Sequence, residues 1–362
     1  MSVKDRAYLD WNASAPLRPK ARDSVIAVLA ETGNPSSVHA EGRRARGIME
    51  LARAQVAELV GCSPAEVVFT SGATEAASVL RHLSPDHSVC VHALAHDCLW
   101  AHHDVASASA VPEGPGHVLA MSHANSETGV ITEPPGPVDG CWPVDGVRCD
   151  RLLLDVAQSA GKVPFDFRAS GADLAILSAH KLGGPKGVGA LIVRDGTEIE
   201  ALLCGGGQEL GRRSGTENVA GIAGFGAAAL DASLDLAAGL WAEVESLRDD
   251  LENALEASAN KTIFVGRDSR RLPNTSCFVT PGWKGETQVM QMDLAGFAVS
   301  SGSACSSGKV KGSRVLRAMG LDARTAESAL RVSIGPTTTG EEVMRFADAW
   351  TKQERKLRQR AA

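Results

Sequence analysis

The chain contains, at residues 152–159, the string LLLDVAQS, an apolar run that ends in Asp155 with Gln158 three residues later. Such a run is typical of a buried strand in a parallel sheet. A carboxylate at the mouth of this strand is placed to hold a protonated ring nitrogen, and the amide can reach a neighbouring ring oxygen. This arrangement suits pyridoxal phosphate, whose electron-sink chemistry requires a protonated pyridinium nitrogen. An ordinary helix N-cap is the alternative for Asp155.

Strand-like and helix-like patterns alternate on both sides of this string, from about residue 45 to 230, which predicts an α/β unit with a mostly parallel sheet. Apolar residues at steps of three and four predict a helix over Arg46–Gly61. Residues 107–147 are rich in Pro, Gly and small residues, so we expect them to cross the surface with little regular structure. The expected strands are Glu66–Thr70, Val89–Ala93, Leu152–Leu154, Ala172–Leu177 and Val188–Val193.

A change of composition near Gly226 marks the expected domain junction. An alanine-rich stretch there runs into a long helix with apolar residues on one face between Leu240 and Leu255. The remainder predicts a smaller α+β domain, with strands near 276–280 and 331–334 and a last helix around 341–358. We therefore predict a large domain over residues 14–228 and a small domain formed by residues 1–13 and 229–362.

Charge and composition exclude several classes of partner. The 362 residues include 37 basic and 43 acidic side chains, a net charge of -6, so no basic field is present to hold a nucleic acid directly. The first residues are charged, and no apolar run approaches the roughly 20 residues that a bilayer span requires. We therefore expect no membrane contact and a cytoplasmic protein. His96, His102 and His103 lack a cysteine or carboxylate at helical ligand spacing, so no metal site is predicted.

Two further strings have residue types that bind pyridoxal phosphate. Ser71–Thr74 (SGAT) follows a strand and opens a helix, where small residues, free N–H groups and the Thr74 hydroxyl can cradle a phosphate. Ser178–Lys181 (SAHK) closes an apolar run before a glycine-rich turn, a place suited to a lysine that forms a Schiff base with an aldehyde. Ser178 and His180 are further candidates for phosphate donors. A routine N-cap and a surface lysine are the alternatives.

The eight cysteines are scattered, without a Cys-x-x-Cys pair, so neither a zinc ribbon nor a disulfide framework is expected. Most stand in apolar runs such as Ser276–Val279, where we expect a small buried side chain. Cys305 differs, because it stands among small and polar residues with Lys309 and Lys311 close by. We expect this segment to be mobile, and the lysines favour the thiolate, which predicts a nucleophile.

In order and spacing, these strings resemble the fold type I pyridoxal-phosphate enzymes of the class V aminotransferase group, and specifically the cysteine desulfurases of the NifS/IscS kind. The resemblance implies a large domain with a mostly parallel sheet of the seven-stranded type and a smaller α+β C-terminal domain with Cys305 on a mobile loop. Further matches extend along nearly the whole chain. They are Tyr8–Asp10, Gly33–Ser37, Phe69–Glu75, Asn125–Gly129, Gly205–Glu209, Arg213–Thr216 and Ser301–Cys305.

The resemblance also implies a role for each matching residue. Lys181 would carry the Schiff base of pyridoxal 5'-phosphate, Asp155 would hold the pyridinium nitrogen, and Gln158 would donate to the phenolic oxygen. His96 matches the ring-stacking histidine, and Arg331 matches the arginine that clamps the substrate carboxylate by a bidentate contact. The remaining implied contacts are Asn125 beside cofactor and substrate and, around the phosphate, Ala73, Thr74, Ser178, His180 and, from the partner subunit of a homodimer, Thr216.

The implied activity is removal of sulfur from L-cysteine, which gives L-alanine and a persulfide on Cys305, with Lys181 or His96 moving protons. A sulfur-acceptor protein would then receive the sulfur for iron–sulfur clusters, other thio-cofactors or tRNA thiolation, and its identity is open. Alternatives of the same fold are a selenocysteine lyase and a class V aminotransferase, although a transaminase has no use for a mobile thiol. An alternative of another class is an inactive binding scaffold for sulfur relay, against which intact Lys181, Asp155 and Cys305 argue.

Several positions depart from the family's pattern. The stretch between His96 and Asn125 is shorter than in the bacterial housekeeping members, so we expect a helix and a strand of the large domain to be missing. Ala76–Ser78 replaces an asparagine-containing helix start, and Leu94 and Ala95 stand before the stacking histidine. Few residues follow Cys305, which predicts a short or absent C-terminal extension for scaffold docking. These departures affect the expected partners more than the chemistry.

Overall fold

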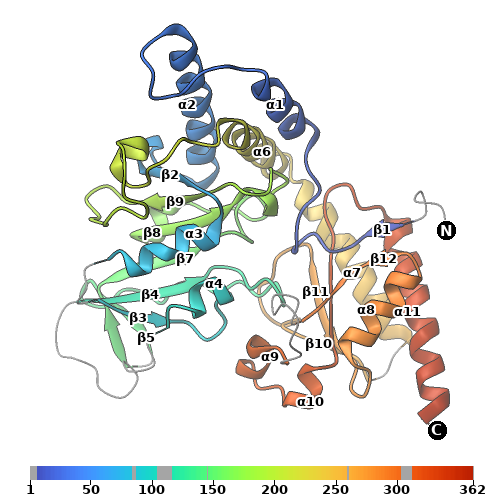
Figure 1. The fold of residues 1–362 in the computed structure, drawn as a ribbon. Helices are drawn as coiled ribbons and strands as arrows, with labels where there is room; N and C mark the ends of the chain where they lie inside the picture. The colour runs from blue at the N-terminus through green and yellow to red at the C-terminus, as the bar shows by residue number, and fades with distance from the viewer. Residues whose placement is uncertain are drawn as a thin grey trace. The chain divides into compact units, whose positions relative to one another are not determined.

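The computed structural model describes residues 6–83, 87–103, 116–144, 146–258, 261–302 and 312–361. The chain forms two compact units (Figure 1). The large unit comprises Pro16–Ala124 and Thr132–Ala237, and the small unit comprises Met1–Ala15, Asn125–Ile131 and Ala238–Ala362. The division into domains after residues 13 and 228 remains a prediction. The small unit includes the short segment 125–131, which the sequence analysis left within the large domain.

A central sheet, six-stranded in the described residues, forms the middle of the large unit. Strands β8, β7, β4 and β3 run parallel, whereas β9 is antiparallel to both of its neighbours. The prediction of a mostly parallel sheet is confirmed. The described residues form six of its strands, whereas the resemblance implies a sheet of the seven-stranded type. In spatial order the strands are β2 (Val67–Thr70), β9 (Gly189–Val193), β8 (Leu174–Ser178), β7 (Arg151–Asp155), β4 (His117–Ser122) and β3 (Ser88–Val91).

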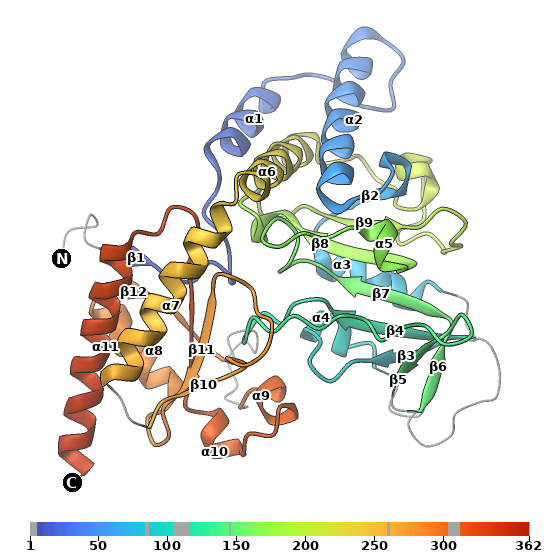
Figure 2. The ribbon, with the colours of Figure 1, turned by 180° about the vertical axis from the view of Figure 1, so that it is seen from behind.

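Helices cover both faces of this sheet because both faces of its strands are apolar. On β7, Leu152 and Leu154 pack toward α2 and α6, whereas Leu153 packs toward α3 and α4. Figures 1 and 2, which view the molecule from opposite sides, show α3 in front of the sheet and behind it, respectively. The helices of the unit are α1 (Pro19–Leu29), α2 (Ala40–Val60), α3 (Ala73–Ala77), α4 (Asp97–Trp100), α5 (Phe167–Ser170) and α6 (Val219–Ala237), with 3₁₀ turns η2 (Pro64–Glu66), η3 (Ser78–Arg81), η5 (Ala179–Lys181) and η6 (Gln208–Gly211).

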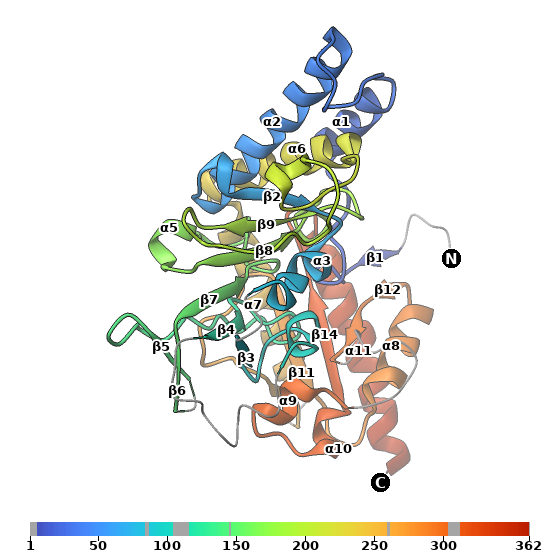
Figure 3. The same ribbon diagram turned by 60° about the vertical axis from the view of Figure 1, so that its left-hand side comes forward.

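The expectation of little regular structure over residues 107–147 is wrong for part of this stretch. His117–Ser122 forms β4, which is buried along its whole length between β3 and β7. Trp142–Val144 (β5) and Val147–Cys149 (β6) form an antiparallel pair (Figure 3). The apolar run of β4 is too short for its periodicity to separate a strand from its surroundings. This run is identified as a strand by its pairing with β3 and β7.

Helix α6 is the one helix in the described ranges that is long and apolar enough to cross a membrane by length and composition, although the sequence analysis noted no such run. Half of its most apolar 18-residue window is buried inside the fold. The helix packs closely on α2, since a Cβ on Gly226 would lie 2.5 Å from the Ala52 Cα. The core helix of a globular unit passes the same test as a membrane span, so the finding is weak evidence for one.

The small unit contains a four-stranded antiparallel sheet in its described part, with helices on both faces. On β11, Phe278 packs on Trp350 of α11 at 5.4 Å between ring centroids, whereas its neighbour Cys277 packs toward Leu316 of α9. Helices α7, α8 and α11 lie side by side (Figure 2). The sheet order is β10 (Ile263–Phe264), β11 (Thr275–Val279), β14 (Ala329–Ser333) and β13 (Ser300–Ser301); β1 (Ala7–Tyr8) pairs with β12 (Phe297–Ala298), and the helices are α7 (Leu240–Ser258), α8 (Gly285–Leu294), α9 (Arg314–Ala318), α10 (Ala323–Ala326) and α11 (Gly340–Ala361).

Candidate active site

Three neighbouring parallel strands carry polar side chains at one edge of the central sheet. Ser122 ends β4, Asp155 ends β7 and Ser178 ends β8. Ser122 is the register partner of Asp155, and all three residues are buried. The carboxyl ends of parallel strands are where open α/β sheets bind their ligands. The string at residues 152–159 therefore places Asp155 at the edge where a ligand is expected.

Two neutral donors hold the Asp155 carboxylate. The Ser122 hydroxyl donates to Oδ2 at 3.3 Å, and the Ala157 N–H donates to Oδ1 at 3.0 Å. Neither donor is charged, and the residue is only 6% exposed. A buried anion of this kind is stabilised when a cation pairs with it. A protonated ring nitrogen, the partner predicted for Asp155, meets this requirement.

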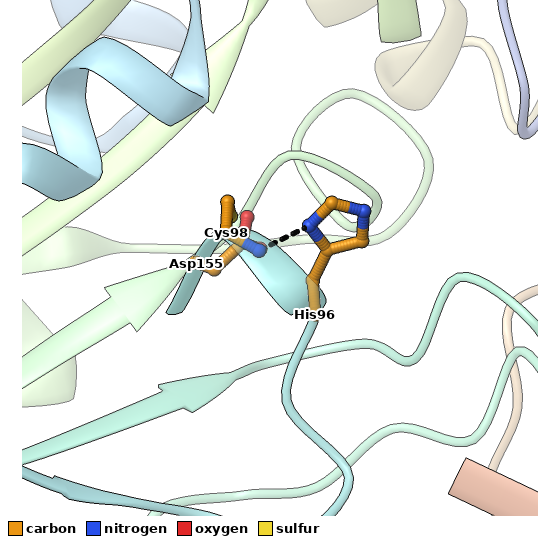
Figure 4. A group of neighbouring side chains, drawn as sticks. All are labelled: His96, Cys98 and Asp155. Carbon is orange, nitrogen blue, oxygen red and sulfur yellow. Dashed lines mark hydrogen bonds between the residues drawn. The ribbon is translucent and has the colours of Figure 1, made fainter. Parts of the chain in front are cut away.

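His96 lies beside Asp155 at the start of α4 (Figure 4). Its backbone N–H donates to the Ser122 hydroxyl oxygen at 3.1 Å, and its Nδ1 accepts the Cys98 N–H at 3.1 Å. Because Nδ1 is an acceptor here, the proton of the neutral imidazole is on Nε2. The Ser122 side chain therefore connects the backbone of His96 to the carboxylate of Asp155.

The side chains of His96, Cys98 and Asp155 offer ligand atoms within 4.8 Å of one another, a spacing that a metal ion could bridge. The sequence analysis predicted no metal site, and the fold is what brings Asp155 to the other two. Two features favour an organic ring over a metal. The His96 nitrogen drawn toward the group in Figure 4 already accepts a backbone N–H. Burial also raises the pKa of the Cys98 thiol, which disfavours a thiolate ligand.

Gln158 is buried in the turn that follows Asp155. Its Oε1 accepts a hydrogen bond from the Lys162 ammonium at 2.8 Å, and Lys162 is itself buried. This bond turns the amide oxygen of Gln158 toward Lys162, and the donor role predicted for the amide nitrogen stays a prediction. Lys162 was not singled out by the sequence analysis.

The predicted phosphate cradle begins α3. Gly72 has φ 158° and ψ 176°, a conformation almost confined to glycine, and the N–H groups of Ala73 and Thr74 fall in the first turn, where no carbonyl within the helix accepts them. A Cβ on Gly72 would lie 3.8 Å from the Ser178 Oγ, and one on Gly189 would lie 2.7 Å from the Gly72 Cα. The loop therefore lies close to the end of β8, where its N–H groups and the Ser178 hydroxyl can bind one anion.

The turn η5 directly follows β8 and carries His180 and Lys181. Gly184 keeps this turn tight, since a Cβ there would lie 2.8 Å from the Ala179 Cβ. Burial, with smaller effects from the charges of Lys181 and Lys186, lowers the pKa of His180 to about 4. The imidazole is therefore neutral at pH 7, and the two lysines make the local potential positive. Such a potential favours a phosphate.

Thr216 is exposed in the large unit and lines a cavity of about 80 Å³ together with Ser71 and Arg213. Arg213 donates to the Glu75 carboxylate at 2.8 Å, and the same carboxylate accepts the Ser71 N–H at 2.8 Å. Arg213, three residues before Thr216, is thus connected through Glu75 to the Ser71–Thr74 string of the same chain. Donation by Thr216 to the phosphate of a partner subunit stays a prediction.

Arg331 belongs to the small unit, where it stands on β14 and is 3% exposed. Its Nη2 donates to Asp10 Oδ1 at 2.7 Å, and its Nη1 donates to the Ser126 carbonyl at 2.9 Å. Its Nε is buried and has no hydrogen-bond partner within the described ranges. A guanidinium donor left over in this way fits an incoming carboxylate, the ligand predicted for Arg331.

Asn125 also belongs to the small unit and is buried. Its Oδ1 accepts the N–H groups of Glu127 and Thr128 at 2.9 Å each, and the Thr128 hydroxyl at 3.1 Å. These bonds shape the turn whose Ser126 carbonyl binds Arg331. The contact of Asn125 with cofactor and substrate stays a prediction.

The predicted nucleophile, Cys305, lies outside the described residues. Among the cysteines that the structure describes, burial raises the pKa of Cys62 and of Cys277 to about 12, so both thiols stay protonated and are poor nucleophiles. Cys204 is exposed. The role of Cys305 therefore remains a prediction from its sequence context.

Sequence reasoning missed three residues that contact predicted site residues within their own unit. Ser122 ends an apolar run as Asp155 does, which is the signal that could have revealed it. Lys162 follows Gln158 by four residues, the spacing of neighbours on one helical turn. Asp10 stood only within a matching stretch, and its contact with Arg331 has no local signal in the sequence.

The donor types present fit pyridoxal phosphate group by group. A buried carboxylate is available for the ring nitrogen, an amide N–H for the phenolic oxygen, first-turn N–H groups and hydroxyls for the phosphate, and a lysine for the aldehyde. Asp155 accepts hydrogen bonds from two uncharged donors, and the cationic ring nitrogen would add an opposite charge beside it.

Comparisons with known proteins agree with this chemistry. The family model described as aminotransferase class-V matches residues 7–111 and 102–346. A cysteine desulfurase of Cereibacter sphaeroides is 37% identical over 95% of this chain and 94% of its own length, and a cysteine desulfurase IscS of Anaeromyxobacter sp. (strain Fw109-5) is 36% identical over 99% of this chain and 94% of its own. The X-ray structure of a NifS-like protein from Rickettsia africae ESF-5 has a TM-score of 0.82 and 27% identity, covering 96% of this chain and 99% of its own.

The fold and the family model define a class V aminotransferase, a class of fold type I enzymes that depend on pyridoxal phosphate. Within that class, the chain belongs to the cysteine desulfurase family of the NifS/IscS kind, since its identity to those relatives extends over almost the whole length of both chains. The resemblance seen in the sequence is thereby confirmed, together with the fold type and the cofactor of the class.

Proposed function

We propose that the protein is a pyridoxal-phosphate-dependent cysteine desulfurase that converts L-cysteine to L-alanine and leaves the sulfur on Cys305 as a persulfide. One cysteine and one enzyme thiol become one alanine and one persulfide, so atoms and electrons balance without another reactant. The observation that carries the proposal is the buried Asp155 carboxylate, held by neutral donors beside His96. The names of the relatives support the substrate.

Each residue of the site has a separate task. Pyridoxal phosphate, when bound, accepts the electrons that substrate bond cleavage releases. Asp155 keeps the ring nitrogen protonated, and Lys181 holds the aldehyde and moves a proton at its amine. His96 carries its proton on Nε2 and is the second proton-transfer group. Arg331 binds the substrate carboxylate with the Nε that has no partner in the described part of the chain.

The assembly and the partners of the enzyme belong to the same proposal. We expect a homodimer in which Thr216 reaches the phosphate of the partner subunit, and a sulfur-acceptor protein that draws the persulfide into iron–sulfur cluster formation or another thiolation. The support is the similarity to a cysteine desulfurase IscS and to a NifS-like protein of known structure. We also expect the protein to act in the cytoplasm.

The decisive experiment treats the loaded protein with L-cysteine and locates the added sulfur by mass spectrometry. The wild type forms alanine and a persulfide on Cys305. Cys305→Ser still takes up pyridoxal phosphate and binds cysteine, but it releases essentially no alanine. Cys204→Ser, which removes an exposed cysteine of the large unit, keeps full activity.

Two further results of that experiment define the outcome. Lys181→Ala loses the adduct that borohydride traps between protein and cofactor. Sulfur on a cysteine other than Cys305, or an adduct that persists without Lys181, contradicts the assignment. Turnover of selenocysteine alone identifies a selenocysteine lyase instead.

A further inference from the structure

Lys162 is a buried lysine directly behind the residue that we place at the cofactor's phenolic oxygen. It is 3% exposed, and its Nζ donates to Gln158 Oε1 at 2.8 Å. Gln158 is also buried, at 5% exposure. Lysine ammonium groups are almost never fully buried without a specific partner, because desolvation of the charge is unfavourable. The pair therefore calls for a reason beyond packing.

The local backbone places this lysine inside the unit. Gly161 has φ 75°, and a Cβ there would lie 2.8 Å from the Ala232 Cβ of α6. The Lys162 N–H donates to the Ser159 carbonyl at 3.0 Å, which closes the turn from Ser159 to Lys162, directly after Gln158. The Lys162 side chain stays inside the unit, where its Nζ meets Gln158 Oε1.

The chemistry of the two groups determines how the amide is oriented. An ammonium group has three donors and no acceptor, so only the oxygen of Gln158 can face it. The Nε2 donors of Gln158 are thereby directed to the opposite end of the side chain. A glutamine without such a neighbour can rotate by half a turn and present either end, because its oxygen and nitrogen are nearly equal in shape.

We propose that Lys162 is a positioning residue that fixes the amide of Gln158 as a hydrogen-bond donor to the phenolic oxygen of pyridoxal phosphate. The inference rests on the proposed function, since it needs the cofactor to lie against Gln158. The positive charge behind the amide also polarises it, which strengthens its N–H as a donor in this buried place. Lys162 thus acts on the cofactor through Gln158 without touching it.

A double-mutant cycle on cofactor binding tests this coupling. Cofactor-free protein is titrated with pyridoxal phosphate, and the Kd is measured for the wild type, Lys162→Met, Gln158→Ala and the double variant. Gln158→Ala weakens binding about tenfold, the size of one hydrogen bond to a charged group. Lys162→Met weakens it about fivefold in the wild-type background and less than twofold when Gln158 is already replaced.

A second readout does not depend on turnover. The visible absorbance of the loaded protein is followed against pH. When the phenolic oxygen of the cofactor receives a weaker hydrogen bond, its anionic form is less stabilised. The proton that this oxygen shares is then lost only at higher pH. Lys162→Met therefore moves the midpoint of this titration upward by about 0.5 pH unit. Lys20→Met, which removes a surface lysine paired with Asp231 in the same unit, leaves both Kd and midpoint unchanged.

Thermal unfolding of the cofactor-free variants separates positioning from folding. If Lys162→Met does not fold, Lys162→Gln is used, since its shorter, neutral side chain stays polar but can present either a donor or an acceptor to Gln158. Independent effects of the two replacements on Kd, or a midpoint that does not move, overturn the inference. Lys181→Ala distinguishes the two levels: if it abolishes the borohydride-trapped adduct while the cycle shows independence, the proposed function stands and only the role of Lys162 falls.

Discussion

Asp155 in the large unit and Arg331 in the small unit are both buried charges, yet they are supported in opposite ways. The Asp155 carboxylate receives hydrogen bonds from a hydroxyl and a backbone N–H, neither of which is charged. The Arg331 guanidinium is paired with the Asp10 carboxylate and a backbone carbonyl, and only its Nε is left without a partner in the described residues. Among the described residues the first charge has no salt-bridge partner, whereas the second is largely compensated by Asp10.

The difference suits two ligands that stay bound for different lengths of time. An uncompensated buried charge is unfavourable when it stands alone, so the place of Asp155 suits a cation that remains bound, as a resident cofactor does. A guanidinium already paired with a carboxylate tolerates an empty site, so the place of Arg331 suits a ligand that arrives and leaves in each turnover.

Removing the charge of Asp155 should have the largest effect on the reaction. Asp155→Asn keeps the shape but no longer holds the ring nitrogen protonated, and we expect kcat to fall about 10³-fold, roughly 4 kcal/mol of barrier. The free energy of unfolding of the cofactor-free chain should stay the same or rise, because an unpaired buried charge is gone. Alanine formation and thermal unfolding of both forms measure these effects. A clear loss of stability in the cofactor-free chain would show that Asp155 is compensated after all.

Removing Arg331 should act on substrate binding and on stability together. Arg331→Met should raise the KM for cysteine about 100-fold, the loss of roughly 3 kcal/mol of carboxylate binding, with a smaller change in kcat. It should also lower the free energy of unfolding by about 3 kcal/mol, because Asp10 loses its partner. The double variant Asp10→Asn/Arg331→Met is the matched control. It should recover stability but not KM, and recovery of neither would contradict the compensation by Asp10.

Removing a neutral donor from Asp155 should have a smaller effect. Ser122→Ala deletes the bond to Oδ2 and the acceptor of the His96 N–H. We expect the Kd of pyridoxal phosphate to rise about fivefold, equivalent to about 1 kcal/mol for one hydrogen bond. Titration of the cofactor-free protein measures this change. If Ser122→Ala lowered kcat as much as Asp155→Asn does, the geometry of the Asp155 carboxylate rather than its charge would be what matters for the reaction.

Burial of His180 should make the stability of the large unit depend weakly on pH. Its pKa is lowered to about 4 in the fold, mainly by burial, and lies near 6.5 in the unfolded chain. As the pH falls, the unfolded chain takes up the proton first and is stabilised by it. The free energy of unfolding is therefore highest above pH 6.5 and falls between pH 6.5 and 4. After allowance for solvent screening we expect about 1 kcal/mol. Denaturant unfolding of the cofactor-free chain at several pH values should show this slope in the wild type and not in His180→Asn.

Local pattern predicted the elements whose signals lie within one stretch of chain. The helix expected over residues 46–61 is part of α2, which ends where Gly61 adopts φ 69°. It begins earlier, because the His39 side chain accepts the Gly42 N–H at 3.3 Å, a cap that the apolar periodicity does not reveal. The strand β4 was missed for a related reason, since its run is short and only its two neighbours identify it.

The sequence by itself determined the strand, turn and glycine strings that carry Asp155, Gln158 and Lys181, because each string has its own pattern of apolar, polar and small residues. Only the tertiary structure decided what these side chains contact. Ser122 reaches Asp155 through the register of two strands, and Arg331 meets Asp10 although they are far apart in the chain. Hydrogen bonds over such separations depend on how the strands pair and the helices pack. No local pattern of residues encodes them.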